Sequence, residues 1–243
     1  MLDMRRTFSL STVAAALVAA LIPAAAVAAM IELGQTRTPL VAPACPSNVS
    51  AQNCTIVLTR ATAVETLRDG TAYPTKVKTS GRIVAFTVGL SSLSSNKATR
   101  KKYIQFLDST YGGTTQVAIT VLKPVGSKRQ YRWQVVATSP AYHVQPYMGS
   151  VAQFALSSSI EVTPGEVLAL TTPTWAPVLS INQPTKKFAY RQSRSSNCNN
   201  PPSTSQAQTK PGQTASYACD YPGTRIEYSA TEITNPQATN PVH

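Results

Sequence analysis

The chain has 243 residues, of which 42% are hydrophobic and 13% are charged, and its formal net charge is +12 at pH 7. A hydrophobic share of this size is enough to form a buried core and excludes an intrinsically disordered polyelectrolyte. Two histidines and four cysteines argue against a metal site with several histidine ligands and against catalysis that depends on histidine. We expect no cofactor and no metal, and the sequence names no substrate.

The first 29 residues have the pattern of a secretory signal peptide. Arg5 and Arg6 precede an uncharged, alanine-rich run over residues 8–22, and residues 26–28 read Ala-Val-Ala, which fits signal peptidase. The alternative is an uncleaved membrane anchor, but a run of about 15 residues is shorter than the roughly 20 that span a bilayer. The adjacent arginines also fit a twin-arginine signal, so the export route stays open. We predict a secreted or envelope-associated protein with no membrane span.

The four cysteines, Cys45, Cys54, Cys198 and Cys219, all follow the predicted signal peptide. Export makes disulfide bonds their expected state. The sequence leaves three connectivities open; the local one pairs Cys45 with Cys54 and Cys198 with Cys219. Neither spacing matches the paired cysteines of zinc sites. We treat residues 30–54, which hold the first two cysteines, as a lead-in to the folded domain.

The body of the chain has the pattern of β-strands. Apolar and polar residues alternate in residues 115–123, 131–139 and 225–231. In the last segment we expect Ile226 and Tyr228 inside and Arg225 and Glu227 outside. Residues 82–90 are apolar on both faces and fit a central strand that is covered on both sides. Shorter candidate strands are residues 55–62, 103–107, 151–156, 166–171, 178–181 and 187–191.

These elements predict an all-β fold. No window shows a sustained helical period with caps, and residues 64–68 allow one helical turn at most. About nine or ten short strands between Gly and Pro turns indicate one antiparallel β-sandwich over residues 55–233. Doubly wound α/β folds and TIM barrels are excluded because helices do not alternate with the strands. We expect a basic loop at residues 96–102, a polar loop at 192–218 and a disordered tail at 234–243.

The segment over residues 160–170, with Pro164-Gly165 at its centre, resembles the hairpin that recurs in jelly-roll sandwiches. The runs at residues 82–92, 189–194 and 222–230 also resemble uncharacterised secreted proteins of actinobacterial type, from high-GC Gram-positive bacteria. That resemblance covers most of residues 55–233. It implies export and a jelly-roll-like β-sandwich, and it transfers neither an activity nor a site residue.

Catalytic arrangements are poorly supported. His143 is the only histidine in the body, and no Gly-x-Ser-x-Gly motif is present. A glycosidase needs two carboxylates on either side of the scissile bond; Asp108 and Asp220 stand beside loops and would be the first choices, whereas we expect most other acids on solvated faces. Asp108 also suggests calcium, but no acidic cluster supplies the further ligands. We therefore predict no catalytic residue.

Aromatic and basic residues offer a better candidate site. Trp175 lies between two prolines in an expected rigid loop, and Tyr142 and Tyr147 bracket His143; exposed rings of this kind stack on sugars. The alternative is that these rings close the core. Basic residues gather in three groups along the sequence. The first is Lys97, Arg100, Lys101 and Lys102, and the second is Lys123, Lys128, Arg129 and Arg132. The third is Lys186, Lys187, Arg191 and Arg194. If they converged, they would attract polyanions rather than only keep the surface soluble.

The leading hypothesis is a non-catalytic protein that binds carbohydrate or an anionic cell-envelope polymer through Trp175, Tyr142, Tyr147, Arg191 and Arg194. We expect no nucleic-acid partner, because export removes the usual target of a basic protein. The alternatives are a secreted hydrolase acting on glycans and a structural, self-associating surface protein. The sequence specifies no oligomeric state.

Overall fold

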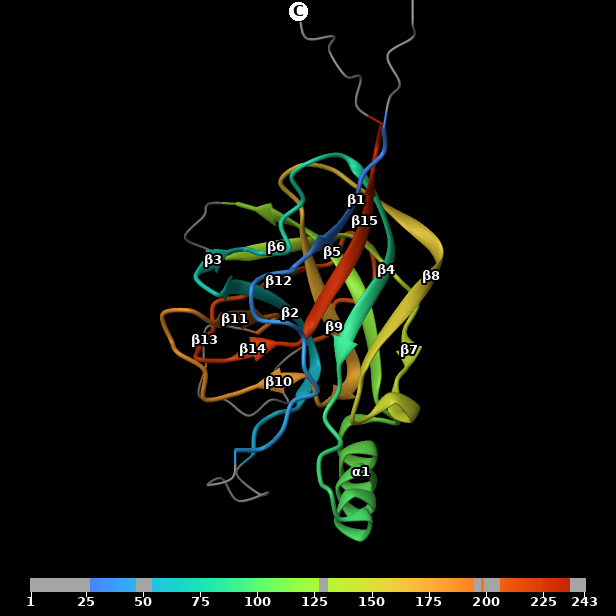
Figure 1. Cartoon of the computed structure of the whole chain (residues 1–243), viewed down its shortest axis with the longest axis vertical. Helices are drawn as coiled ribbons and strands as arrows, with labels where there is room; N and C mark the ends of the chain where they lie inside the picture. Colours follow the sequence, from blue (N-terminus) through green and yellow to red (C-terminus); the bar gives the residue numbers. More distant parts are fainter. Residues whose placement is uncertain (1–26, 47–53, 127–130, 195–197, 199–205, 237–243) are drawn as a thin grey trace, which may run out of the picture.

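The computed structural model describes residues 27–46, 54–126, 131–194, 198 and 206–236 (Figure 1). Within them the chain is built mostly of antiparallel strands with one α-helix, which confirms the all-β, sandwich-like class. One sheet has the order β1-β15-β4-β8. Its strands are β1 (Met30–Leu33), β15 (Tyr228–Thr234), β4 (Gly81–Gly89) and β8 (Val151–Val162). Strand β1 falls in the predicted lead-in, so that segment contributes to the sheet.

The second, larger sheet has the order β12-β6-β5-β9-β2-β11-β13, with β3 paired to β2 and β7 to β5. Its strands are β2 (Leu58–Arg68), β3 (Thr71–Ala72), β5 (Gln116–Val125), β6 (Arg132–Thr138), β7 (Tyr142–His143), β9 (Val167–Ala176), β11 (Ala189–Gln192), β12 (Thr214–Ser216) and β13 (Asp220–Pro222). A separate pair consists of β10 (Leu179–Ser180) and β14 (Arg225–Ile226). A 3₁₀ turn, η3 (Gln145–Tyr147), follows β7.

The main core lies between the two sheets. Val117, Ile119 and Val121 of β5 face Phe86 and other apolar residues of the smaller sheet, as the period-two pattern predicts. The opposite face of the large sheet is also covered. There Leu122 packs with Trp133, Tyr217 and their neighbours in a second cluster. Strands β5 and β9 are therefore buried on both faces over most of their length, as are β2 and β15, whereas β4 leaves Arg82 exposed.

The expectation that Arg225 and Glu227 face solvent is wrong. Both are buried, with Arg225 Nε 3.4 Å from Glu227 Oε2. The reason is the segment after β1, which covers this face: Arg225 donates hydrogen bonds to the carbonyl oxygens of Thr38 (3.0 Å) and Pro39 (2.9 Å). Alternation in the sequence cannot reveal that a distant segment covers the polar face.

The basic loop predicted at residues 96–102 and the strand predicted at 103–107 are both wrong, because helix α1 spans Lys97–Tyr111. Asn96 caps its start by accepting a hydrogen bond from the Thr99 N–H (3.0 Å), and Gly112 ends it with a φ of +85°. Figure 1 shows α1 projecting from one end of the body. Residues 64–68, in contrast, belong to β2 rather than to a helical turn.

Other expectations are resolved in part. The turn at Pro164-Gly165 connects β8 to β9 in the other sheet, so these strands do not form the expected paired hairpin. Two disulfides, Cys45–Cys54 and Cys198–Cys219, realise the local pairing. Outside the described residues lie residues 1–26 of the signal peptide predicted over residues 1–29, residues 195–197 and 199–205 of the polar loop, and residues 237–243 of the tail. Among the described helices, none is long and apolar enough to cross a bilayer.

Candidate functional site

A cleft of about 860 Å³ lies between α1 and the end of the large sheet where β2, β11 and β13 meet. This is within the usual size of small-molecule sites. Most of its lining is aliphatic or aromatic, with Ile56, Val57, Leu93, Tyr103, Phe106, Leu107, Tyr111, Leu179, Ile181, Tyr190 and Tyr221. The polar lining comes from Thr55, Thr59, Lys102, Gln192, Arg194 and Thr224, and the Cys45–Cys54 disulfide borders it. None of the lining residues that the structure describes is acidic.

One wall of the cleft is a stacked pair of tyrosines. Tyr190 of β11 is the register partner of Tyr221 of β13, which puts their side chains on the same face of the sheet. Their ring centroids are 4.7 Å apart with an interplanar angle of 16°. Burial raises the pKa of the Tyr190 phenol well above its ordinary value, so this phenol carries no charge at neutral pH.

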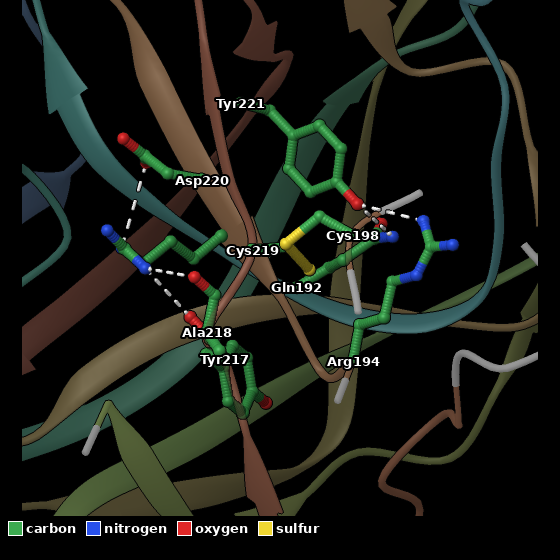
Figure 2. The surroundings of a disulfide bond; sticks show 9 residues. Gln192, Arg194, Cys198, Tyr217, Ala218, Cys219, Asp220 and Tyr221 are labelled. Carbon is green, nitrogen blue, oxygen red and sulfur yellow. Dashed lines mark hydrogen bonds and ion pairs between the residues drawn. A yellow bond between two sulfur atoms is a disulfide. The ribbon is translucent and has the colours of Figure 1, made fainter. Parts of the chain in front are cut away.

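Arg194 lines the cleft and forms no ion pair with any residue that the structure describes. Arg194 is only 6% exposed, and its Nη1 donates to the hydroxyl oxygen of Tyr221 at 3.1 Å. The Gln192 amide donates to the same oxygen at 3.0 Å. The Nε and Nη2 atoms of Arg194 are buried and have no hydrogen-bond acceptor among the described residues. Figure 2 shows Arg194, Gln192 and the Tyr221 hydroxyl converging beside the Cys198–Cys219 disulfide.

Burying a guanidinium without a counter-ion is costly, because water no longer solvates the charge and the orphaned N–H groups lose their hydrogen bonds. No carboxylate in the described part of the chain forms an ion pair with Arg194. Lys102 of α1 adds a second positive charge to the lining. The cleft therefore combines a largely apolar lining with two positively charged side chains, which suits a ligand with an apolar body and an anionic group.

Arg191, the other arginine of the predicted site, is fully engaged within the protein. Its Nη1 donates to the carbonyl oxygens of Tyr217 (3.1 Å) and Ala218 (2.8 Å), and its Nε lies 3.6 Å from Asp220 Oδ1. Its guanidinium also lies 3.8 Å from the ring centroid of Tyr131. Arg191 therefore holds β11 to the segment before β13 and is not part of the cleft lining.

The expectation that Trp175 sits in an exposed loop is wrong. It lies within β9 opposite Thr59 and is fully buried. Its indole N–H donates to Asp108 Oδ1 and to the Gly113 carbonyl oxygen, both at 3.0 Å. Pro173 lies within β9 and Pro177 directly follows it, and because its ring is buried, Trp175 cannot stack on a sugar. It joins the C-terminal end of α1 to the body instead.

Tyr142 and Tyr147 do not line the cleft either. Tyr142 packs edge-on against Phe86 with the centroids 5.2 Å apart, and its hydroxyl donates to the Ala155 carbonyl oxygen at 2.9 Å. Tyr147 is 47% exposed and packs edge-on against Phe154 at 5.0 Å. These rings close one edge of the core, which is the alternative considered above. His143 between them is exposed, with Nδ1 3.1 Å from the hydroxyl oxygen of Thr114.

The buried carboxylates are elsewhere. Glu65, Glu227 and Glu232 are inaccessible to solvent, contrary to the expectation of solvated faces. Burial raises the pKa of Glu65 to about 7, although its ion pair with Arg68 opposes the shift. Arg68 in turn donates to the carbonyl oxygens of Gly34, Ile226 and Tyr228, so this cluster binds the N-terminal segment to the sheet. No group of three metal-ligating side chains occurs in the described ranges.

The basic groups converge only in part. Lys102 of the first group and Arg194 of the third meet at the cleft. The second group does not: Lys123 and Arg132 lie near the end of β5 that is far from α1, and Lys128 and Arg129 lie outside the described residues. The aromatic lining was missed by sequence reasoning, although the spacing of Tyr103, Leu107 and Tyr111 is that of one helix face.

No protein-family model matches the chain, and no curated protein and no solved structure shows a significant similarity to it. The resemblance to secreted actinobacterial proteins therefore stays a prediction, and the function has to be argued from the cleft.

Proposed function

We propose that the protein is an exported, non-catalytic binding protein whose cleft takes an anionic amphiphile of the cell envelope: an acyl or similar apolar chain that ends in a carboxylate or phosphate. The observation that carries this proposal is Arg194, a buried guanidinium in a largely apolar cleft, whose Nε and Nη2 have no hydrogen-bond acceptor among the described residues. This keeps the anionic envelope partner expected from the sequence and gives up the sugar platform that included Trp175.

The two ends of such a ligand match different parts of the cleft. A carboxylate or phosphate accepts hydrogen bonds from two guanidinium nitrogens at once, which would satisfy the Nε and Nη2 of Arg194 together. The apolar chain would lie between the face of α1 that carries Phe106 and the wall formed by Ile56 and the stacked tyrosines. Removing that chain from water supplies the non-directional part of the affinity.

The two disulfides support export, because such bonds persist in oxidising compartments. In an envelope, anionic amphiphiles are within reach of an exported protein. The lining residues described here offer no carboxylate pair for glycoside hydrolysis, which is why binding is proposed rather than the hydrolase alternative.

Calorimetric titration with four probes tests the proposal: dodecanoate, dodecyl phosphate, the uncharged sugar amphiphile dodecyl maltoside, and polygalacturonate. We expect both anionic amphiphiles to bind, and dodecyl maltoside to bind at least about tenfold more weakly because it leaves Arg194 unpaired. Arg194→Met should weaken dodecanoate binding by roughly 10- to 100-fold. Lys123→Met, which removes an exposed charge far from the cleft, is the matched control and should change nothing.

Equal affinity for dodecyl maltoside would contradict the proposal, as would an Arg194→Met protein that binds dodecanoate like the wild type. Binding of polygalacturonate alone would instead support the acidic-polysaccharide partner.

A further inference from the structure

We propose that the N-terminal half of α1, which carries Lys97, Arg100, Lys101 and Lys102, is a docking surface for an anionic lipid bilayer. Docking there would hold the cleft against the membrane from which the amphiphile is taken. The reason for docking rests on the proposed function, but the evidence for the docking surface is separate from the evidence for the ligand. It comes from the charge, exposure and attachment of the helix.

The positive charge of α1 is concentrated in its N-terminal half. Lys97, Arg100, Lys101 and Lys102 fill its first two turns, and the only acidic residue of the helix is Asp108. Asp108 is engaged with the buried Trp175 indole. A further positive charge, Arg60, lies instead at the C-terminal end of the helix, with its guanidinium 5.8 Å from the ring centroid of Tyr111. Clusters of four or more basic side chains are attracted to anionic lipid surfaces.

The attachment of α1 leaves the basic half available. Leu107 is the only buried residue of the helix, and the hydrogen bonds from Trp175 hold its last turn and the following Gly113. Lys97, Lys101 and Lys102 are exposed. Figure 1 shows that the helix projects from the end of the body, so a flat surface can approach it without meeting the sheets first.

An exposed aromatic ring lies where the cleft opens. Phe106 is 60% exposed, and it follows Lys102 by one helical turn; both residues line the cleft. An exposed apolar ring next to a cluster of basic side chains is the pattern of segments that lie in the interface of a bilayer. Seated there, Phe106 would leave water and the cleft would face the acyl region, so an amphiphile could enter without crossing the aqueous phase.

A bilayer fits this surface better than a water-soluble polyanion. Nucleic acid or an acidic polysaccharide would neutralise the lysines but would offer nothing to Phe106 or to the apolar cleft beside it. An anionic bilayer matches both features, because negative headgroups lie directly over an apolar layer.

Vesicle co-sedimentation tests the inference with the purified protein. We expect binding to vesicles of 30% phosphatidylglycerol in phosphatidylcholine and at least tenfold weaker binding to phosphatidylcholine alone. The triple variant Lys97→Gln, Arg100→Gln, Lys101→Gln leaves the cleft lining intact and should weaken binding to the anionic vesicles by about 100-fold. The control Lys76→Gln, Lys78→Gln, Lys123→Gln removes the same charge from exposed residues of other elements and should weaken it by less than about threefold.

A second readout does not depend on charge removal. In Phe106→Trp, the new indole should be quenched by brominated lipid in anionic vesicles, whereas the native tryptophans, Trp133 and Trp175, are both buried. Equal losses in the two triple variants, or an unquenched indole on bound vesicles, would overturn docking through α1.

The outcomes separate the two proposals. The α1 triple variant should bind dodecanoate in solution within twofold of the wild type, because Lys102 and Arg194 are unchanged. If neither the wild type nor the α1 triple variant binds dodecanoate but vesicle binding still depends on the α1 charges, the proposed function fails and the docking surface stands. If dodecanoate binds at Arg194 and vesicle binding ignores α1, the docking inference alone fails.

Discussion

Replacing Arg194 with methionine should stabilise the protein without ligand while it weakens ligand binding. Within the described residues, Arg194 buries two guanidinium nitrogens, Nε and Nη2, without an acceptor and makes one side-chain hydrogen bond, to Tyr221. Each buried, unsatisfied group costs about 1–3 kcal/mol, and the lost hydrogen bond is worth about 1 kcal/mol. Methionine has a similar length and packs well in irregular apolar space. We therefore expect the free energy of unfolding to rise by about 2 kcal/mol.

Thermal and urea unfolding of the two proteins measure this change. For a chain of this size, 2 kcal/mol corresponds to a rise in Tm of about 5 °C. Arg191→Met is the matched control, because Arg191 has Asp220, two carbonyl oxygens and the Tyr131 ring as partners. That substitution should destabilise the protein by about 2–4 kcal/mol. A loss of stability in Arg194→Met comparable to that of Arg191→Met would refute the reasoning, because it would mean that Arg194 is already satisfied within the protein.

Three further predictions concern stability. Trp175→Phe removes both hydrogen bonds that hold the end of α1 and should lower the free energy of unfolding by about 2 kcal/mol and the helix signal in circular dichroism; unchanged values would mean that apolar contacts alone hold the helix. Because burial raises the folded-state pKa of Glu65 to about 7, the folded protein binds the Glu65 proton more tightly than the unfolded chain does. The free energy of unfolding should therefore fall by about 3 kcal/mol from pH 4.5 to pH 7, relative to the Glu65→Gln protein. Parallel curves of unfolding free energy against pH for the two proteins would contradict this. Replacing Cys198 and Cys219 together with serine opens a loop of 21 residues and should cost about 3 kcal/mol in urea unfolding, whereas a cost below 1 kcal/mol would show that the unfolded chain is not constrained by this bond.

The strands could be predicted from the sequence because one face of each packs on the core. The alternation around Ile119 places the same side chains inside that the structure buries. Arg225 and Glu227 follow the same alternation, yet both are buried, because the segment after β1 covers their face. Local periodicity does not encode which distant segment will cover a face.

Helix α1 was missed because it packs so little of its surface on the body. A helix that buries only Leu107 needs no continuous apolar stripe, so its period is weak. Its caps were nevertheless readable: Asn96 precedes a run of good helix formers, and Gly112 follows it. Weighing the caps together with the spacing of the aromatic residues would have predicted the helix.

The sequence could suggest candidate residues for the site, but not which of them lie together in the folded protein. Arg194 was among the residues proposed from the sequence, but so were Trp175, which is buried in a strand, and Arg191, which is fully engaged. The difference between the two arginines arises from what surrounds each one after folding. The cleft joins segments as distant as Ile56 and Tyr221, and no local pattern can show that they meet.

The most direct test of the ligand proposal is a crystal structure of the protein with 12-bromododecanoate. We expect carboxylate oxygens within about 3 Å of Arg194 Nε and Nη2. We also expect an anomalous bromine peak along the apolar wall between α1 and Ile56. A cleft that remains without the bromine while the ligand is bound elsewhere, or a carboxylate that turns away from Arg194, would contradict the proposal that Arg194 binds the anionic group.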